Sequence, residues 1–124
     1  MIKAYFAEIE ATIQTFSYLD SYSLKKKLFN KTFCYIGGSI TFINGHRLDF
    51  MEAKQFDPIA KPKYRYHYMH ENNEMIFRYD NSQHHKHLLN FPHHKHISTE
   101  IVASTEPEMQ DVLLEIARLI RESE

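Results

Sequence analysis

Two stretches of strict alternation between apolar and polar residues constrain the fold of this chain most. Residues 64–70 read Tyr-Arg-Tyr-His-Tyr-Met-His, and residues 75–80 read Met-Ile-Phe-Arg-Tyr-Asp. A period of two is typical of a strand with one buried face, and the two asparagines at 72–73 tolerate the backbone of a tight turn. A two-residue turn predicts the cross-strand pairs Tyr68–Phe77, Tyr66–Tyr79, His67–Arg78 and Arg65–Asp80. The chain should therefore hold an antiparallel hairpin with one aromatic face and one ionisable face.

The flanking segments predict further strands and two helices. A three-residue loop at 43–45, with Gly45 left-handed, sets Ile40 opposite Leu48 in a second hairpin. Apolar residues recur at helical spacing near both ends of the chain, and the second helix carries a capping-box signal in Thr105 and Glu108. Short connections favour sequential pairing of the strands. The expected fold is α+β: an antiparallel meander of about five strands, N-terminal and C-terminal helices packed on one face, a His-rich loop, and one domain spanning residues 1–124.

Composition excludes several classes of protein. With 124 residues, 43% hydrophobic and 25% charged, the chain has the composition of one globular domain. No apolar run approaches the roughly 20 residues of a membrane-spanning helix, and no signal peptide is expected at the N-terminus. The single cysteine, Cys34, is typical of a reducing compartment. A net charge of -1 gives no global basic field for nucleic acid. We therefore expect a cytoplasmic protein.

Histidine is concentrated in one part of the chain. Eight of the nine histidines fall between residues 67 and 96, and the tetrapeptide His-His-Lys-His occurs twice, at 84–87 and 93–96. Paired histidines beside cations suit general acid–base cleavage of RNA without a metal, because the 2′-hydroxyl supplies the nucleophile. Histidine tracts also bind Zn, Ni or Cu, although no standard zinc spacing is present. For any single histidine, a solvated loop position is the simplest interpretation.

Residues 63–96 also resemble a known family. The runs at 63–68 (KYRYHY), 77–81 (FRYDN), 84–85 (HH) and 91–96 (FPHHKH) are similar to TumE-type toxins of prokaryotic toxin–antitoxin systems. The stretch from Ser82 to His87 departs from the proline-containing pattern of that family, but it leaves His84 and His85 in register. The resemblance implies a small cytosolic toxin that inhibits growth, and a partner antitoxin with a helix-turn-helix DNA-binding domain.

Two functions of different class follow from these observations. The first is a ribonuclease-like site with RNA as substrate, formed by His67, Arg78, Asp80, His84, His85, His93, His94 and Lys95, with no cofactor expected. In this site His93 or His94 would serve as acid or base, and Arg78 and Lys95 would bind phosphate. The second is a non-enzymatic domain that binds a partner or a divalent transition metal through its loop. The candidate metal ligands are His84, His85, His93, His94, His96 and Glu52. An edge strand and aromatic faces also favour a homodimer.

Overall fold

A computed structural model of the chain describes all residues from Met1 to Glu124 and contains one sheet and two helices. The elements in chain order are α1 (Ile2–Gln14), β1 (Leu19–Leu28), β2 (Phe33–Phe42), β3 (Arg47–Phe56), β4 (Ile59–Met69), β5 (Met75–Asp80), β6 (His94–Ile97), β7 (Glu100–Ala103) and α2 (Met109–Glu122). The seven strands pair in sequence order, each antiparallel to the next. The predicted α+β meander is therefore confirmed, with seven strands rather than about five.

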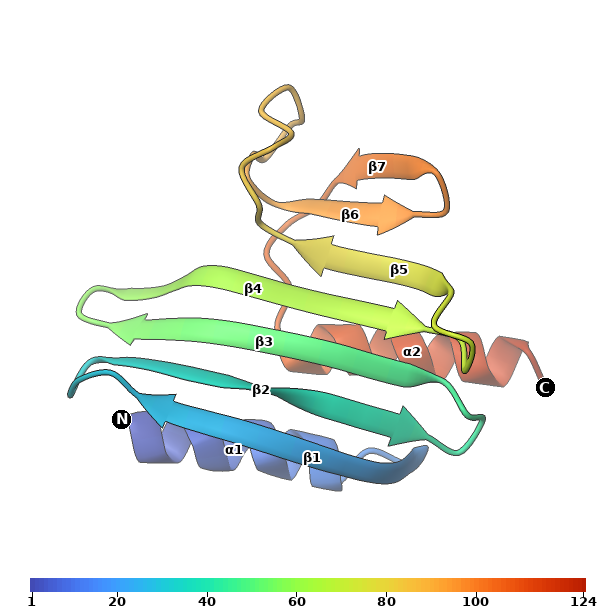
Figure 1. The fold of residues 1–124 in the computed structure, drawn as a ribbon, viewed down its shortest axis with the longest axis horizontal. Helices are drawn as coiled ribbons and strands as arrows, with labels where there is room; N and C mark the ends of the chain where they lie inside the picture. The colour runs from blue at the N-terminus through green and yellow to red at the C-terminus, as the bar shows by residue number, and fades with distance from the viewer.

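Both helices cover the same face of the sheet and leave the other face bare. In Figure 1 the helices lie on the far side of the sheet, with α1 behind β1 and β2 and α2 behind the middle strands. The core between the two layers takes Ile9 and Ile13 from α1, Ile116 from α2, and alternate residues such as Leu48 and Phe77 from the strands. The alternation of the sequence thus becomes a division between a packed face and an open face.

Three tyrosines of β4 occupy the centre of the core. Tyr64, Tyr66 and Tyr68 are almost completely buried, and each hydroxyl group has a polar partner, as buried polar groups require. The Tyr66 hydroxyl donates to Glu52 Oε2 at 2.5 Å, while the hydroxyls of Tyr64 and Tyr68 each meet a histidine. The core is therefore aromatic but contains a hydrogen-bonded polar network.

The predicted hairpin pairs are present, and the details of the turns differ. All four predicted pairs between β4 and β5 occur, and Ile40 lies opposite Leu48 with Gly45 at a φ of 86°. The β4–β5 turn is not the simple two-residue loop, because a register shift after Tyr68 pairs Met69 with Met75. The shift lies at the tip of the hairpin, so the predicted pairing below it is unchanged.

Two other expectations are corrected. Helix α2 begins at Met109, and its capping box joins Glu108 to Asp111 rather than Thr105 to Glu108. Pro107, whose backbone carbonyl accepts from Lys61, lies just before the helix. The second histidine tetrapeptide also does not lie wholly in the loop, because its last three residues begin β6, which forms a hairpin with β7. No helix is both long and apolar enough to cross a bilayer.

Candidate functional site

The open face of the sheet carries two cross-strand rows of ionisable side chains. One row runs through Asp49, His67, Arg78 and His96 on strands β3 to β6, because each of these residues pairs with the next. The second row runs through Arg65, Asp80 and His94 on β4 to β6. Because each strand contributes every second residue to this face, the sheet brings together side chains up to 47 positions apart. We call these seven residues the open-face site.

Asp80 is the hub of the open-face site. Its carboxylate accepts a hydrogen bond from Arg78 Nε at 3.1 Å and one from the Ser82 backbone N–H at 3.0 Å. One carboxylate oxygen also lies 2.7 Å from His94 Nε2, and the other lies 3.4 Å from His96 Nε2. Burial alone would raise the pKa of Asp80, but the Ser82 N–H and the neighbouring histidines hold it below its ordinary 3.8. Asp80 is therefore a fixed anion that orients the cations around it.

His67 has two arginines as neighbours on the open face and a ring nitrogen without a hydrogen-bond partner. Arg65 precedes it by two residues on the same face of β4, and Arg78 is its partner on β5. Its Nε2 is buried and has no hydrogen-bond partner. Burial lowers the pKa of His67 below its ordinary 6.5, and Arg78 and Arg65 lower it further. At neutral pH this imidazole is uncharged, so it can accept a proton.

Three histidine rings meet at the β6 end of the site. His85, from the loop after β5, has its ring centre 4.8 Å from that of His94 and 5.8 Å from that of His96. Their ligand atoms all lie within 4.8 Å of one another, so these three residues could hold a metal ion. Burial lowers the pKa of His85 and of His96, helped by His94 in the first case and by Arg78 in the second. Three of the six expected metal ligands thus come together, one from the loop and two from β6.

A cavity opens beside these rows and has a positively charged wall. It has a volume of about 690 Å³, and its lining includes Tyr35, Lys63, Arg65, Arg78, Asp80 and His84. Three permanent cations face one carboxylate there, which favours an anionic ligand. Tyr35 adds an aromatic surface of the kind on which a nucleic-acid base stacks. The cavity therefore combines a positively charged wall with an aromatic surface.

Three of the predicted site residues lie on the helix side of the sheet, away from the open-face site. His93 Nδ1 is 2.8 Å from the Tyr64 hydroxyl, and the two rings stack. Lys95 forms an ion pair with Glu115 of α2 at 2.6 Å. Glu52 is completely buried in the core. His93 and Lys95 lie on the helix side because successive residues of a strand point to opposite faces, and both are direct neighbours of His94.

Two residues of the site were absent from the predicted set. Arg65 and Asp49 belong to the open-face rows. Both occupy polar positions in the same alternation of apolar and polar residues that placed His67 on the ionisable face. His84, which was predicted, lines the cavity, whereas its loop neighbour His87 does not; both residues are exposed. Applying this alternation to each strand in turn predicts that Arg65 and Asp49 share the face of His67.

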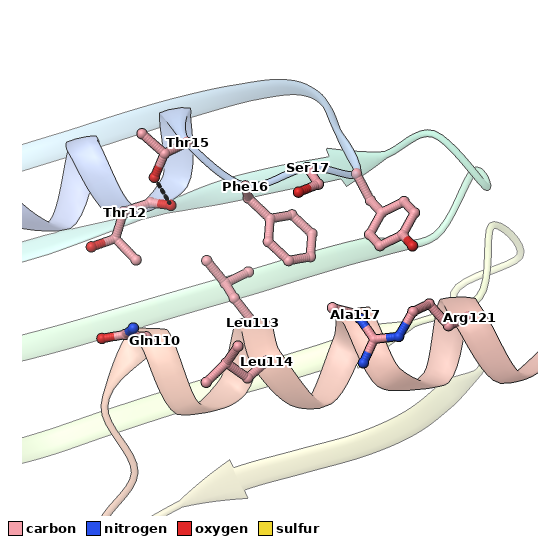
Figure 2. Close-up of a pocket in the computed structure, with 10 residues that line it drawn as sticks. Thr12, Thr15, Phe16, Ser17, Gln110, Leu113, Leu114, Ala117 and Arg121 are labelled. Atoms are coloured by element: carbon pink, nitrogen blue, oxygen red, sulfur yellow. Dashed lines mark hydrogen bonds between the residues drawn. The ribbon is translucent and has the colours of Figure 1, made fainter.

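A groove on the opposite face has no comparable chemistry. Figure 2 shows it between the end of α1 and α2, with Leu113, Leu114 and Arg121 on one side and Thr12 and Thr15 on the other. Its volume is about 340 Å³. Both threonine hydroxyls donate to backbone carbonyls of α1, so they are not free for a ligand. Arg121 is the only charged residue in the lining of this groove.

Comparison with known proteins gives one result. The family described as "Toxin TumE" matches residues 9–124 of the chain. No curated protein and no solved structure matches it.

Proposed function

This chain belongs to the TumE toxin family, and on that premise we propose that it arrests growth by cutting RNA at the open-face site. Membership of the family indicates the toxin component of a toxin–antitoxin system, and hence an antitoxin partner. The proposal adds the reaction and the residues that perform it. We also propose that the antitoxin carries a helix-turn-helix domain, as the family resemblance implies.

One observation carries the proposal: a histidine with a buried, unpartnered nitrogen has two arginines as neighbours on the same face of the sheet. His67 is that histidine, and Arg65 and Arg78 flank it. Cleavage of RNA by its own 2′-hydroxyl needs a base to remove the hydroxyl proton and cations to stabilise the pentavalent phosphorane. These three side chains supply both functions without a cofactor.

The reaction proceeds by internal transesterification. His67 takes the proton of the 2′-hydroxyl, and the 2′ oxygen attacks phosphorus while Arg65 and Arg78 bind the phosphoryl oxygens. The bond from phosphorus to the 5′ oxygen breaks, which leaves a 2′,3′-cyclic phosphate. The departing 5′ oxygen needs a proton, and His84 on the cavity wall is our candidate for the acid. Asp80 keeps Arg78 in place through the 3.1 Å hydrogen bond.

Induction in bacteria tests the toxin and the reaction together. Wild type should stop growth and fragment RNA, and His67→Gln should do neither because the base is lost. His70→Gln is the matched control, since His70 is an exposed histidine at the end of the same strand and has His46 as its ring neighbour. Growth arrest with intact RNA would overturn the ribonuclease proposal, as would full activity of His67→Gln.

A purified system tests the chemistry more directly. An RNA oligonucleotide should yield fragments with 2′,3′-cyclic phosphate ends. The same oligonucleotide with a 2′-deoxy sugar at the cleaved position should stay intact there, because the nucleophile is missing. Cleavage of the deoxy substrate would contradict the mechanism.

A further inference from the structure

The cluster formed by His85, His94 and His96 goes beyond the proposed reaction, which uses none of its three rings. His94 and His96 lie two residues apart on β6, so both face the open side of the sheet. His85 comes from the irregular segment between β5 and β6 and approaches both of them. The strand holds two rings rigidly, and the loop brings the third.

The hydrogen bonding of His94 leaves one nitrogen available at this point. Its side chain is 1% exposed, and its Nδ1 lies 2.9 Å from the carbonyl oxygen of Pro92. A carbonyl only accepts, so Nδ1 carries a proton, and Nε2 is the ring nitrogen left for another partner. Nε2 has no hydrogen-bond partner and lies 2.7 Å from a carboxylate oxygen of Asp80. A buried ring nitrogen beside a carboxylate favours a cation at this point.

We propose that His85, His94 and His96 form a binding site for a transition-metal ion, with Zn²⁺ as the ion that suits it best. Neutral imidazole is a preferred ligand of Zn²⁺, and three histidines with a fourth, water-filled position are a known zinc arrangement. The Nδ1–H bond of His94 to a backbone carbonyl is the outer contact that typically orients a metal-bound histidine. Asp80, beside the cluster, offsets part of the charge of the ion.

Binding requires only a small closure of the cluster. Tetrahedral zinc, with Zn–N bonds of about 2.0–2.1 Å, places its ligand atoms about 3.3 Å apart. The present separations reach up to 4.8 Å. Because His94 and His96 belong to a paired strand, the movement falls on His85 and its loop.

The ion would act on the loop rather than on the RNA. The same loop supplies Ser82, Gln83 and His84 to the wall of the cavity. A bond to His85 ties this segment to β6, so the metal sets the shape of one side of the cavity. Zinc titration and the RNA-cleavage assay therefore test the metal site and the ribonuclease reaction by separate measurements.

Metal binding is tested on protein prepared without a histidine tag, freed of metal, and titrated with Zn²⁺ by calorimetry and with Co²⁺ by visible absorption. Wild type should bind one equivalent of each ion and give the intense cobalt spectrum of a tetrahedral site. His85→Ala and His96→Ala should each weaken zinc binding by more than about tenfold. His87→Ala is the matched control, since His87 is an exposed histidine two residues from His85, and it should bind like wild type.

Proteolysis gives a readout of the loop itself. Lys86, next to His85, is exposed, so trypsin cleaves there when the loop is released from β6. Zinc at about 100 times its Kd should slow this cleavage about 100-fold in wild type and much less in His85→Ala. The proposal is overturned by less than one equivalent of zinc in wild type. It is equally overturned if His85→Ala keeps wild-type affinity, or if His87→Ala loses as much as His85→Ala, because binding would then belong to the histidine-rich loop at large.

Discussion

Glu52 is the buried carboxylate whose removal should cost the fold most without touching the open-face site. It is completely buried on the helix side of β3, where it accepts hydrogen bonds from the hydroxyls of Tyr5 and Tyr66. Lys61 Nζ in turn donates to the Tyr66 oxygen at 2.7 Å. A hydrogen bond to a buried charged group contributes about 1.5–3 kcal/mol. The network thus joins α1, β3 and β4 through a carboxylate that water does not reach.

Glu52→Gln should lower the free energy of unfolding by about 2 kcal/mol. The amide keeps one oxygen for one tyrosine hydroxyl and loses one charge-assisted hydrogen bond. With an unfolding entropy of about 2.1 cal/mol/K per residue, 124 residues give about 0.26 kcal/mol/K, so Tm should fall by about 8 °C. Thermal unfolding followed by circular dichroism measures the change.

Glu10→Gln is the matched control for this prediction. Glu10 also accepts hydrogen bonds from a tyrosine hydroxyl (Tyr22) and from an amine (Lys26), but it lies at the protein surface. Exposed pairs contribute about 0–1 kcal/mol, so its Tm should change by less than about 4 °C. Equal shifts in the two variants would refute the reasoning that burial makes Glu52 important. A loss of zinc affinity in Glu52→Gln would show that Glu52 belongs with the histidines after all.

Three further outcomes are expected. The pKa of His67 lies below its ordinary 6.5 in the folded protein, so the unfolded state binds more protons as the pH falls through that value, and the free energy of unfolding should drop between about pH 7 and 5. Urea titrations should show a shallower drop for His67→Gln, and equal drops in the two proteins would contradict this. Gly38→Ala would put a Cβ atom 2.0 Å from the backbone oxygen of Ser23, so urea unfolding should show a loss of about 3 kcal/mol of stability. If the urea midpoint of the variant equals that of wild type, β1 and β2 separate easily. Lys95→Gln removes the ion pair with Glu115, so the free energy of unfolding should fall by about 2 kcal/mol and the proposed RNA cleavage should be unchanged. A selective loss of that cleavage would show that Lys95 belongs to the site.

The fold could be predicted in outline because its main signals are local. The alternation from Tyr64 to Asp80 determines both the strands and their pairing, and the positive φ of Gly45 determines the register of the hairpin between Ile40 and Leu48. The strand β6 was missed because His94, Lys95 and His96 have no apolar alternation. The position of the cap of α2 was also wrong, because Thr105 and Glu108 have the right spacing while the structure uses Glu108 and Asp111.

The sequence predicts which kinds of residue form the candidate site, but not which individual residues come together there. The hairpin alone placed His67, Arg78, Asp80 and Arg65 on one face, and this placement follows from the period of a strand. His93, Lys95 and Glu52 have the same chemistry but lie on the other side of the sheet. Their side chains meet Tyr64, Glu115 and Tyr66 instead.

By itself, the sequence determined the antiparallel hairpins, the two amphipathic helices and the concentration of histidine after β5, because all three depend on neighbours within a few residues. Only the tertiary structure decided which histidines converge. The pairing of β6 with β5 sets His94 and His96 toward Asp80, and the path of the loop brings His85 to them. Such contacts depend on strand parity and loop closure over the whole sheet, which no local pattern of residues contains.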